Sequence, residues 1–391
     1  MWKRFRWSLL LLTVSIVVSI GMAEVLLRLW GYRFSGSNYQ KDPVLGWSLR
    51  PGSECWEAEE GIAWNVINSH GFRDRERTIQ KPSGTYRIAV LGDSIAEGRG
   101  VALEDVFTAV LERKLNDCPA YRGRKVEVLN FGVPGYGTAQ ELLQFRHTAA
   151  AYSPDLVILQ FYAGNDMFNN IRELNVSDAD SSPYFLLKDG KLVADNSFRE
   201  RPSHQEAAIR RKNFAANLMN SSHLALMLYK LVRVRAQQAV PGQTLPASEG
   251  PPKNFPSIYP YLPPQIPAME QAWAVTEALI EEFHREVTSR GTGFQLIVLP
   301  LNGQIHPDLE VRRRLQEHMG VPDLYYPDRR LEELTSRAKI DYFSLTKPMG
   351  DYAVKNQVYL SGFVNTAPGD GHPNEKGHRL IADLLHQRLC Q

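Results

Sequence analysis

The sequence holds little cysteine, almost no net charge and no internal repeat. Only three of its 391 residues are cysteines (Cys55, Cys118 and Cys390), so at most one internal disulfide can form. No Cys/His cluster has the spacing of a structural zinc site, and no glycine-rich phosphate-binding loop occurs. A net charge of +2 gives no basis for a nucleic-acid-binding face. The length of the chain is sufficient for one large domain or two smaller ones.

The N-terminus carries the one long hydrophobic run. A basic cluster at residues 3–6 precedes about 17 uncharged residues, Trp7–Ala23. About 17–25 apolar residues span a bilayer as a helix, so the run fits a membrane anchor or the core of a signal peptide with a cleavage site at Gly21-Met-Ala23. Helical spacing continues to Trp30, which favours an uncleaved anchor. The basic cluster predicts a cytoplasmic N-terminus and an extracytoplasmic chain, in the periplasm or at the cell surface.

In that compartment a disulfide can form. Cys118 and Cys390 each end a predicted helical segment, so they are the pair to test first. The alternative is that all three cysteines are free thiols.

The chain divides into three parts by pattern. Residues 1–30 are the predicted signal anchor, and residues 31–85 are a polar extracytoplasmic arm with a few short strands. Residues 86–391 form the main domain, with an insertion at about 167–267. The insertion contains a predicted hairpin about Asp189-Gly190, an apolar helix over 221–235 and a proline-rich loop over 241–267. It is either a lid over the site or a peripheral excursion.

Within the main domain, apolar β-branched runs alternate with amphipathic helical segments. The predicted strands are residues 87–91, 125–130, 155–161, 293–300 and 340–345. Strands that alternate with helices over short connections predict a three-layer α/β/α fold with a parallel sheet of about five strands. In such folds the reactive groups lie at the carboxyl ends of the strands.

Four candidate site residues fall at such ends. Ser94 follows the first strand, Gly135 the second and Asn165 the third, while His372 precedes the last helix. Acyl transfer needs this set, because a serine nucleophile requires a histidine base, usually oriented by a carboxylate. Backbone N–H groups and an asparagine amide serve to hold the negative oxygen of the tetrahedral intermediate.

In these motifs the chain resembles the SGNH (GDSL) hydrolases. The matching blocks are Gly92-Asp-Ser94, Asn130-Phe-Gly-Val-Pro-Gly135, Gly164-Asn-Asp166 and His372-Pro-Asn374. The resemblance implies Ser94 as nucleophile and His372 as base, with the Ser94 N–H, Gly135 and Asn165 as the oxyanion hole. Asp93 and Asp166 are expected to support the loops that carry these residues. The anchor and the arm motif Asn68-Ser-His-Gly-Phe-Arg-Asp74 resemble a bacterial membrane-anchored branch of that superfamily.

One block departs from the family pattern. The family places an aspartate three residues before the histidine, whereas this chain has Asp370-Gly-His372, one residue shorter. Residues two apart in an extended segment point to the same side, so we expect Asp370 to be the carboxylate that orients His372. The alternative is that Asp370 is structural and a backbone carbonyl orients the imidazole.

These features predict a serine ester hydrolase or acyl transferase that needs neither a metal nor an organic cofactor. Its expected substrates are O-acyl groups of cell-surface polysaccharide, and the expected partners are that acylated glycan and the membrane, not nucleic acid. An esterase or lipase for small acyl esters is one alternative. A non-catalytic binding or assembly protein with the same fold is another.

Overall fold

The structure is a computed structural model that describes residues 2–30, 36–175, 179–201, 206–229, 231 and 259–391. Most of the proline-rich segment predicted over 241–267, and the end of the predicted helix 221–235, lie outside the described residues.

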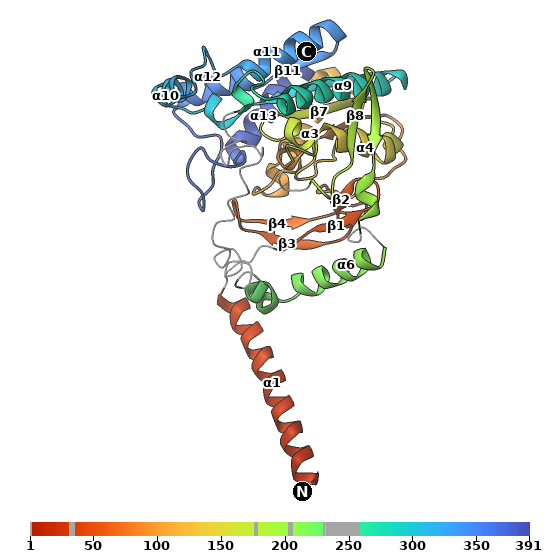
Figure 1. Cartoon of the computed structure of the whole chain (residues 1–391), viewed down its shortest axis with the longest axis vertical. Coiled ribbons are helices and arrows are strands. Elements are labelled where there is room, and N and C mark those ends of the chain that lie inside the picture. The colour runs from red at the N-terminus through yellow and green to blue at the C-terminus, as the bar shows by residue number, and fades with distance from the viewer. Residues whose placement is uncertain (1, 31–35, 176–178, 202–205, 230, 232–258) are drawn as a thin grey trace.

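A five-stranded parallel sheet forms the centre of the main domain (Figure 1). Its order is β11-β10-β7-β5-β6, and every neighbouring pair is parallel, as the sequence predicts. The strands are β5 (Thr85–Leu91), β6 (Lys125–Asn130), β7 (Leu156–Tyr162), β10 (Gly293–Leu299) and β11 (Asp341–Ser344).

Helices cover both faces of this sheet. Along β5, Ile88 and Val90 belong to one buried cluster, while Ala89 and Leu91 belong to the other, as the two-residue period of a strand requires. The first cluster is covered by α3 (Phe107–Asn116), α12 (Thr346–Asn356) and α13 (Glu375–Leu389). The second is covered by α4 (Thr138–His147), α9 (Pro267–Ser289) and α11 (Tyr326–Ala338). A further helix, α10 (Leu309–Met319), has no buried residues.

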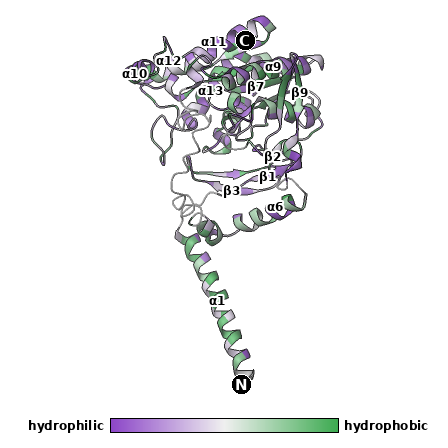
Figure 2. Cartoon of the chain, in the orientation of Figure 1, coloured by the Kyte–Doolittle hydropathy of each residue, from purple (hydrophilic) through white to green (hydrophobic). Residues whose placement is uncertain are grey.

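The first helix, α1 (Trp2–Trp30), extends away from the domain. Its segment Phe5–Trp30 is long and apolar enough to cross a membrane, by length and composition. Figure 2 shows that α1 is mostly hydrophobic along its length, although it packs against little of the protein.

Residues 36–84 carry two small antiparallel hairpins between α1 and the central sheet (Figure 1). The first joins β1 (Tyr39–Asp42) to β2 (Gly46–Leu49), and the second joins β3 (Glu54–Glu57) to β4 (Ala63–Val66). The insertion contains the predicted hairpin, β8 (Tyr184–Lys188) with β9 (Lys191–Asp195), followed by α6 (Glu206–Asn220).

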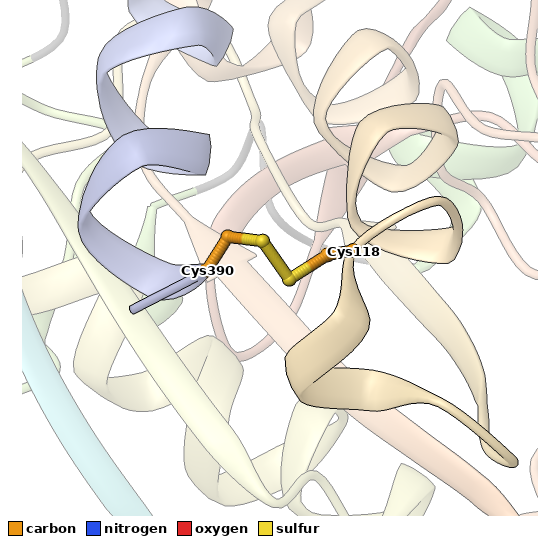
Figure 3. Close-up of a disulfide and its surroundings, with 2 residues drawn as sticks. All are labelled: Cys118 and Cys390. Atoms are coloured by element: carbon orange, nitrogen blue, oxygen red, sulfur yellow. A yellow bond between two sulfur atoms is a disulfide. The ribbon is translucent and has the colours of Figure 1, made fainter.

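A disulfide joins Cys118, just after α3, to Cys390, just after α13 (Figure 3). It links the ends of two helices that pack side by side on the same face of the sheet. The predicted pairing is therefore present, and Cys55 is a buried free thiol.

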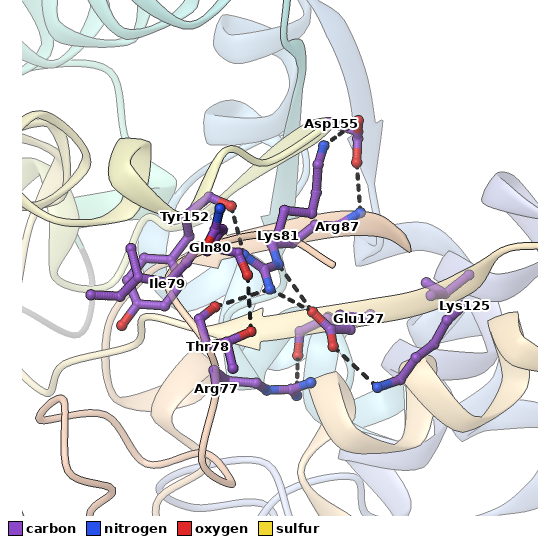
Figure 4. A network of polar contacts seen from close by, with 12 residues as sticks. Arg77, Thr78, Ile79, Gln80, Lys81, Arg87, Lys125, Glu127, Tyr152 and Asp155 are labelled. Atoms are coloured by element: carbon purple, nitrogen blue, oxygen red, sulfur yellow. Dashed lines mark hydrogen bonds and ion pairs between the residues drawn. The ribbon is translucent and has the colours of Figure 1, made fainter. Parts of the chain in front are cut away.

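A buried ionic network attaches the arm to the amino end of the sheet (Figure 4). The guanidinium group of Arg87 has no exposed surface and donates to Glu127 Oε2 at 2.8 and 3.0 Å. It also donates to the backbone oxygens of Thr78 and Ile79 in the arm, at 3.0 and 2.9 Å. A fifth hydrogen bond goes to Tyr152 O, in the turn before β7, at 2.8 Å. The five directed hydrogen bonds of Arg87 thus hold β5, β6, the arm and this turn together.

Removing the disulfide tests how much it contributes to the stability of the fold. The bridge closes a loop of 272 residues, and we expect the Cys118→Ser/Cys390→Ser double variant to lose about 2–5 kcal/mol of unfolding free energy. Urea denaturation measures this loss. A reductant should lower the midpoint of the wild-type chain and leave that of the double variant unchanged, whereas equal responses would contradict the bridge.

Candidate active site

Ser94 lies where β5 gives way to the short helix α2 (Ser94–Glu97). Asp93 caps this helix, because its Oδ1 accepts the N–H of Ile95 at 2.8 Å. Only glycine fits at position 92, because a Cβ there would overlap Gln160 Oε1. The turn therefore fixes the serine at the carboxyl edge of the sheet.

His372 lies between Ser94 and a carboxylate that the sequence analysis did not single out, Glu60. Its Nε2 is 2.7 Å from Ser94 Oγ, and its Nδ1 is 2.7 Å from Glu60 Oε2. The backbone N–H of His372 also donates to Glu60 Oε2, at 2.9 Å. The hydrogen bond from the imidazole lowers the pKa of Glu60 to about 2, so this carboxylate is ionised at neutral pH. The order serine, histidine, carboxylate is the one that activates a serine hydroxyl.

Glu60 reaches this position from the turn between β3 and β4. Asn365 holds the turn, because its amide oxygen accepts the N–H of Gly61 at 2.8 Å and its amide nitrogen donates to Ala58 O at 3.0 Å. Gly371, at φ +71°, leaves the space that the carboxylate occupies, since a Cβ there would overlap Glu60 Oε2. The segment that carries the histidine is therefore shaped to receive Glu60.

Asp370 does not take the place that the sequence analysis expects for it. The residue is exposed, and its backbone N–H donates to Ala367 O at 3.1 Å. Among the described residues, its carboxylate has no hydrogen bond or ion pair, and Glu60 occupies Nδ1 of His372 instead. The physical reason is Gly371, whose left-handed backbone conformation breaks the extended geometry on which the expectation for Asp370 depends.

The sequence contained one indirect signal for Glu60. The position three residues before His372, where the family has its aspartate, is Gly369. A missing acid implies a substitute from elsewhere, but Glu60 is 312 residues away in sequence and lies in an acidic stretch with Glu57 and Glu59.

Three N–H groups near Ser94 are available to a ligand. Neither the N–H of Ser94 nor that of Gly135 is donated to another described residue. The Asn165 amide nitrogen donates one hydrogen to Asp93 Oδ2 at 2.9 Å, which leaves its second hydrogen unused by the described residues. Backbone and amide donors of this kind can stabilise a developing oxyanion.

The glycine-rich turn after β6 is held against the serine turn. The N–H of Val133 donates to Gly92 O at 3.1 Å, and Asn130 Nδ2 donates to Ala96 O at 2.8 Å. Gly135 follows with φ +79°, a conformation that glycine adopts without strain. These bonds bring the Ser94 and Gly135 turns, which are separate in sequence, to the same edge.

Buried carboxyl groups lie behind the site. Asp166 Oδ2 accepts the N–H of Tyr162 at 2.7 Å, so this residue supports the Asn165 loop. Burial, and then the neighbouring Glu141, raise the pKa of Asp166 well above its usual range. Glu141 has no exposed surface, and neither of its carboxyl oxygens has a hydrogen-bond partner among the described residues. Burial likewise raises the pKa of Glu141.

His378, the other histidine of this block, belongs to the core. It is fully buried, its ring stacks on Phe107, and its Nδ1 accepts the Phe107 N–H at 3.3 Å. Burial lowers its pKa to about 3, so it is neutral.

One group of side chains in the described part of the chain has ligand atoms close enough together to hold a metal. It consists of Cys118, His386 and Cys390, and its two sulfur atoms are joined in the disulfide.

Ser94 lies at the carboxyl edge of a parallel α/β sheet, where proteins of this architecture place their functional groups. The model of the GDSL-like lipase/acylhydrolase family matches residues 90–380, and the chain belongs to that family. The resemblance seen in the sequence blocks is thereby confirmed.

Several solved structures are similar to this chain at low identity. One is a protein of the G-D-S-L family described as lipolytic, from Desulfitobacterium hafniense, with 12% identity and a TM-score of 0.35, covering 77% of this chain and 98% of that one. Another is a catalytic mutant of an acetylxylan esterase from Geobacillus stearothermophilus, with 13% identity and a TM-score of 0.38, covering 78% and 94%. No match was found among curated proteins.

Two substitutions separate the roles of the two acidic residues. We expect Glu60→Gln to lower kcat by about 10²–10⁴-fold, because the amide can neither stabilise the imidazolium nor enforce the required tautomer. The matched control Asp370→Asn should keep a kcat within about twofold of wild type, because Asp370 is exposed and its carboxylate has no partner among the described residues. Hydrolysis of p-nitrophenyl acetate measures both, and a larger loss for Asp370→Asn than for Glu60→Gln would contradict this assignment.

The buried Glu141 predicts a pH-dependent stability. The pKa of Glu141 is higher in the folded state than in the unfolded state, so the folded state favours the protonated carboxyl group. The free energy of unfolding therefore falls as the pH rises from the unfolded-state pKa toward the folded-state pKa. We expect Glu141→Gln to resemble wild type near pH 5 and to be more stable by about 1–3 kcal/mol near pH 9. Thermal unfolding across pH measures the difference, with the exposed Glu104→Gln as control. Parallel pH curves for wild type and Glu141→Gln would contradict the prediction.

Proposed function

We propose that the protein cleaves or transfers acyl esters through an acyl intermediate on Ser94. In this proposal His372 is the general base and Glu60 the carboxylate that orients it. The observation that carries the proposal is the position of His372, with 2.7 Å to Ser94 Oγ on one side and 2.7 Å to Glu60 Oε2 on the other. Both distances lie within the range that proton transfer requires.

In the first half of the reaction Ser94 Oγ attacks the ester carbonyl carbon, and its proton passes to His372 Nε2. Glu60, ionised beside Nδ1, stabilises the imidazolium that forms. The tetrahedral intermediate then collapses, the ester C–O bond breaks, and the leaving alkoxide takes the proton from Nε2. The product is an alcohol and an acyl-serine.

In the second half a hydroxyl compound attacks the acyl-serine and gives its proton to His372. The second tetrahedral intermediate collapses, the bond between the acyl carbon and Ser94 Oγ breaks, and His372 Nε2 returns the proton to Ser94 Oγ. If the attacking group is water, the product is a carboxylic acid; if it is a sugar hydroxyl, the acyl group is transferred. The Ser94 and Gly135 N–H groups and the Asn165 amide hold the oxyanion in both halves. Each such donor is worth about 10²–10³ in turnover in comparable enzymes.

The proposed location is the outer side of the cytoplasmic membrane. Residues 1–30 would form the anchor, 31–85 the arm, and 86–391 the catalytic domain with its insertion. The Cys118–Cys390 disulfide supports this location, because such bridges persist in oxidising compartments. The basic residues before Trp7 support the orientation.

The proposed substrates are O-acyl groups of cell-surface polysaccharide, with small acyl esters as the second candidate. The side chains of His372 and Glu60 remain 20% and 26% exposed, so the proposed base can be reached from solvent. A surface location also places the site beside such polymers.

The purified full-length chain in detergent tests the chemistry. We expect turnover of p-nitrophenyl acetate, labelling of Ser94 by a fluorophosphonate probe, and loss of both in Ser94→Ala. Comparison with p-nitrophenyl octanoate reports acyl-chain length, and release of acetate from an acetylated oligosaccharide reports the glycan substrate.

Two results would count against the proposal in different ways. Ester turnover that survives Ser94→Ala would remove the assigned nucleophile. An absence of turnover on every ester, together with an unlabelled Ser94, would favour a binding or assembly protein that keeps the fold.

A further inference from the structure

The insertion exposes large apolar side chains beside the end of α1. Phe214 of α6 is 71% exposed, and Leu228, Tyr229 and Leu231 are each about half exposed. Figure 1 shows α6 and the helical residues 223–229 lying across the C-terminal end of α1, between that helix and the domain. Exposed apolar groups gathered in this way mark a contact surface.

Hydrogen bonds fix these helical segments to α1. Glu24 accepts the backbone N–H groups of His223 and Leu224, both at 3.0 Å, and the hydroxyl of Ser222 at 2.9 Å. Arg28 donates to Ser221 O at 2.9 Å. The start of the helix at 223 is therefore held at the level of Glu24–Arg28.

That level corresponds to the outer boundary of a bilayer. About 20 helical residues, at about 1.5 Å each, cross a hydrocarbon core about 30 Å thick. Counted from Trp7, which follows the basic cluster, the core ends near Leu26. Leu29 and Trp30 come next and are 77% and 74% exposed, and tryptophan is common at membrane interfaces.

The two faces of α6 differ in what they meet. Residues Ile209, Asn213, Ala216 and Asn220 lie on one face at helical spacing and are partly buried. Asn220 on that face exchanges hydrogen bonds with the backbone of Ser37 in the arm, at 3.0 and 2.7 Å. The opposite face carries Arg211 and Phe214, both exposed. It therefore points away from the arm.

We propose that the outer face of α6 and the exposed residues of 223–231 rest in the interfacial layer of an anionic phospholipid bilayer. Phe214, Leu228 and Tyr229 would lie at the boundary of headgroups and acyl chains, while Arg211 faces lipid phosphates. Aromatic and basic residues on one helix face are the composition of helices that lie in a membrane surface. The proposal rests on the proposed anchoring by α1, and it adds a second contact that fixes the orientation of the domain.

Depth-dependent fluorescence quenching tests this contact with the full-length chain. A bimane fluorophore is attached at Phe214→Cys, which is selective because Cys55 is buried and the other two cysteines are paired. The matched control is Leu309→Cys, 60% exposed on α10, far from α1 (Figure 1). Both proteins are reconstituted into phosphatidylcholine/phosphatidylglycerol liposomes with or without lipids carrying a doxyl quencher near the headgroup.

We expect the lipid quencher to reduce emission from position 214 by about twofold and to leave position 309 unchanged, as interfacial burial requires. Liposome flotation and p-nitrophenyl acetate turnover are measured on the same samples. A chain that floats without quenching at position 214 overturns the interfacial contact and leaves the anchor standing. A chain that does not float overturns both. Turnover reports on the Ser94 site alone, so its loss leaves the quenching result valid.

Discussion

Arg73, in the arm, binds the loop that follows the Ser94 helix through hydrogen bonds. Its guanidinium group has no exposed surface and donates to the backbone oxygens of Glu97, Gly98 and Val101, at 3.0, 2.6 and 2.5 Å. A buried guanidinium remains charged, so the loss of these partners would cost several kcal/mol. The arm and the serine loop are therefore restricted to one mutual arrangement. Glu60 depends on that arrangement, because the turn that carries it packs on Gly100 in the same loop.

The sequence could predict the sheet and Ser94, because both depend on local pattern. The strands are short β-branched runs between turn residues, and their order along the chain fixes a parallel sheet. The sequence pattern does not predict the helix α12, because Pro348 and Gly350 interrupt it, although proline is tolerated in a first turn. The helix α10 is harder to recognise from the sequence, because only a narrow stripe of Val311, Leu315 and Met319 interrupts its charged residues and none of its residues is fully buried.

Glu60 could not be predicted from its neighbourhood in the sequence. A carboxylate becomes the partner of a histidine through tertiary placement, and here that placement depends on Asn365 and Gly371, more than 300 residues away. The family pattern directed attention to Asp370, since the usual acid precedes the histidine. The shortened spacing indicated only that the usual geometry was absent. A local motif thus predicts the residues on one loop, whereas a site shared between loops requires the fold.

The contacts from the C-terminal end of α1 to the site form a continuous series. Glu24 binds the helix at 223, Asn220 binds Ser37, and the N–H of Gly36 donates to Trp56 O in β3, at 3.0 Å. From β3 the chain enters the turn that carries Glu60. Such a series does not by itself transmit a signal, because coupling needs an element with two alternative states. The buried networks of Arg73 and Arg87 instead join the arm to both the carboxyl and the amino end of the sheet. The role of the arm is therefore to position the parts that it connects. The arm therefore sets both the position of the domain relative to α1 and the position of the carboxylate beside His372.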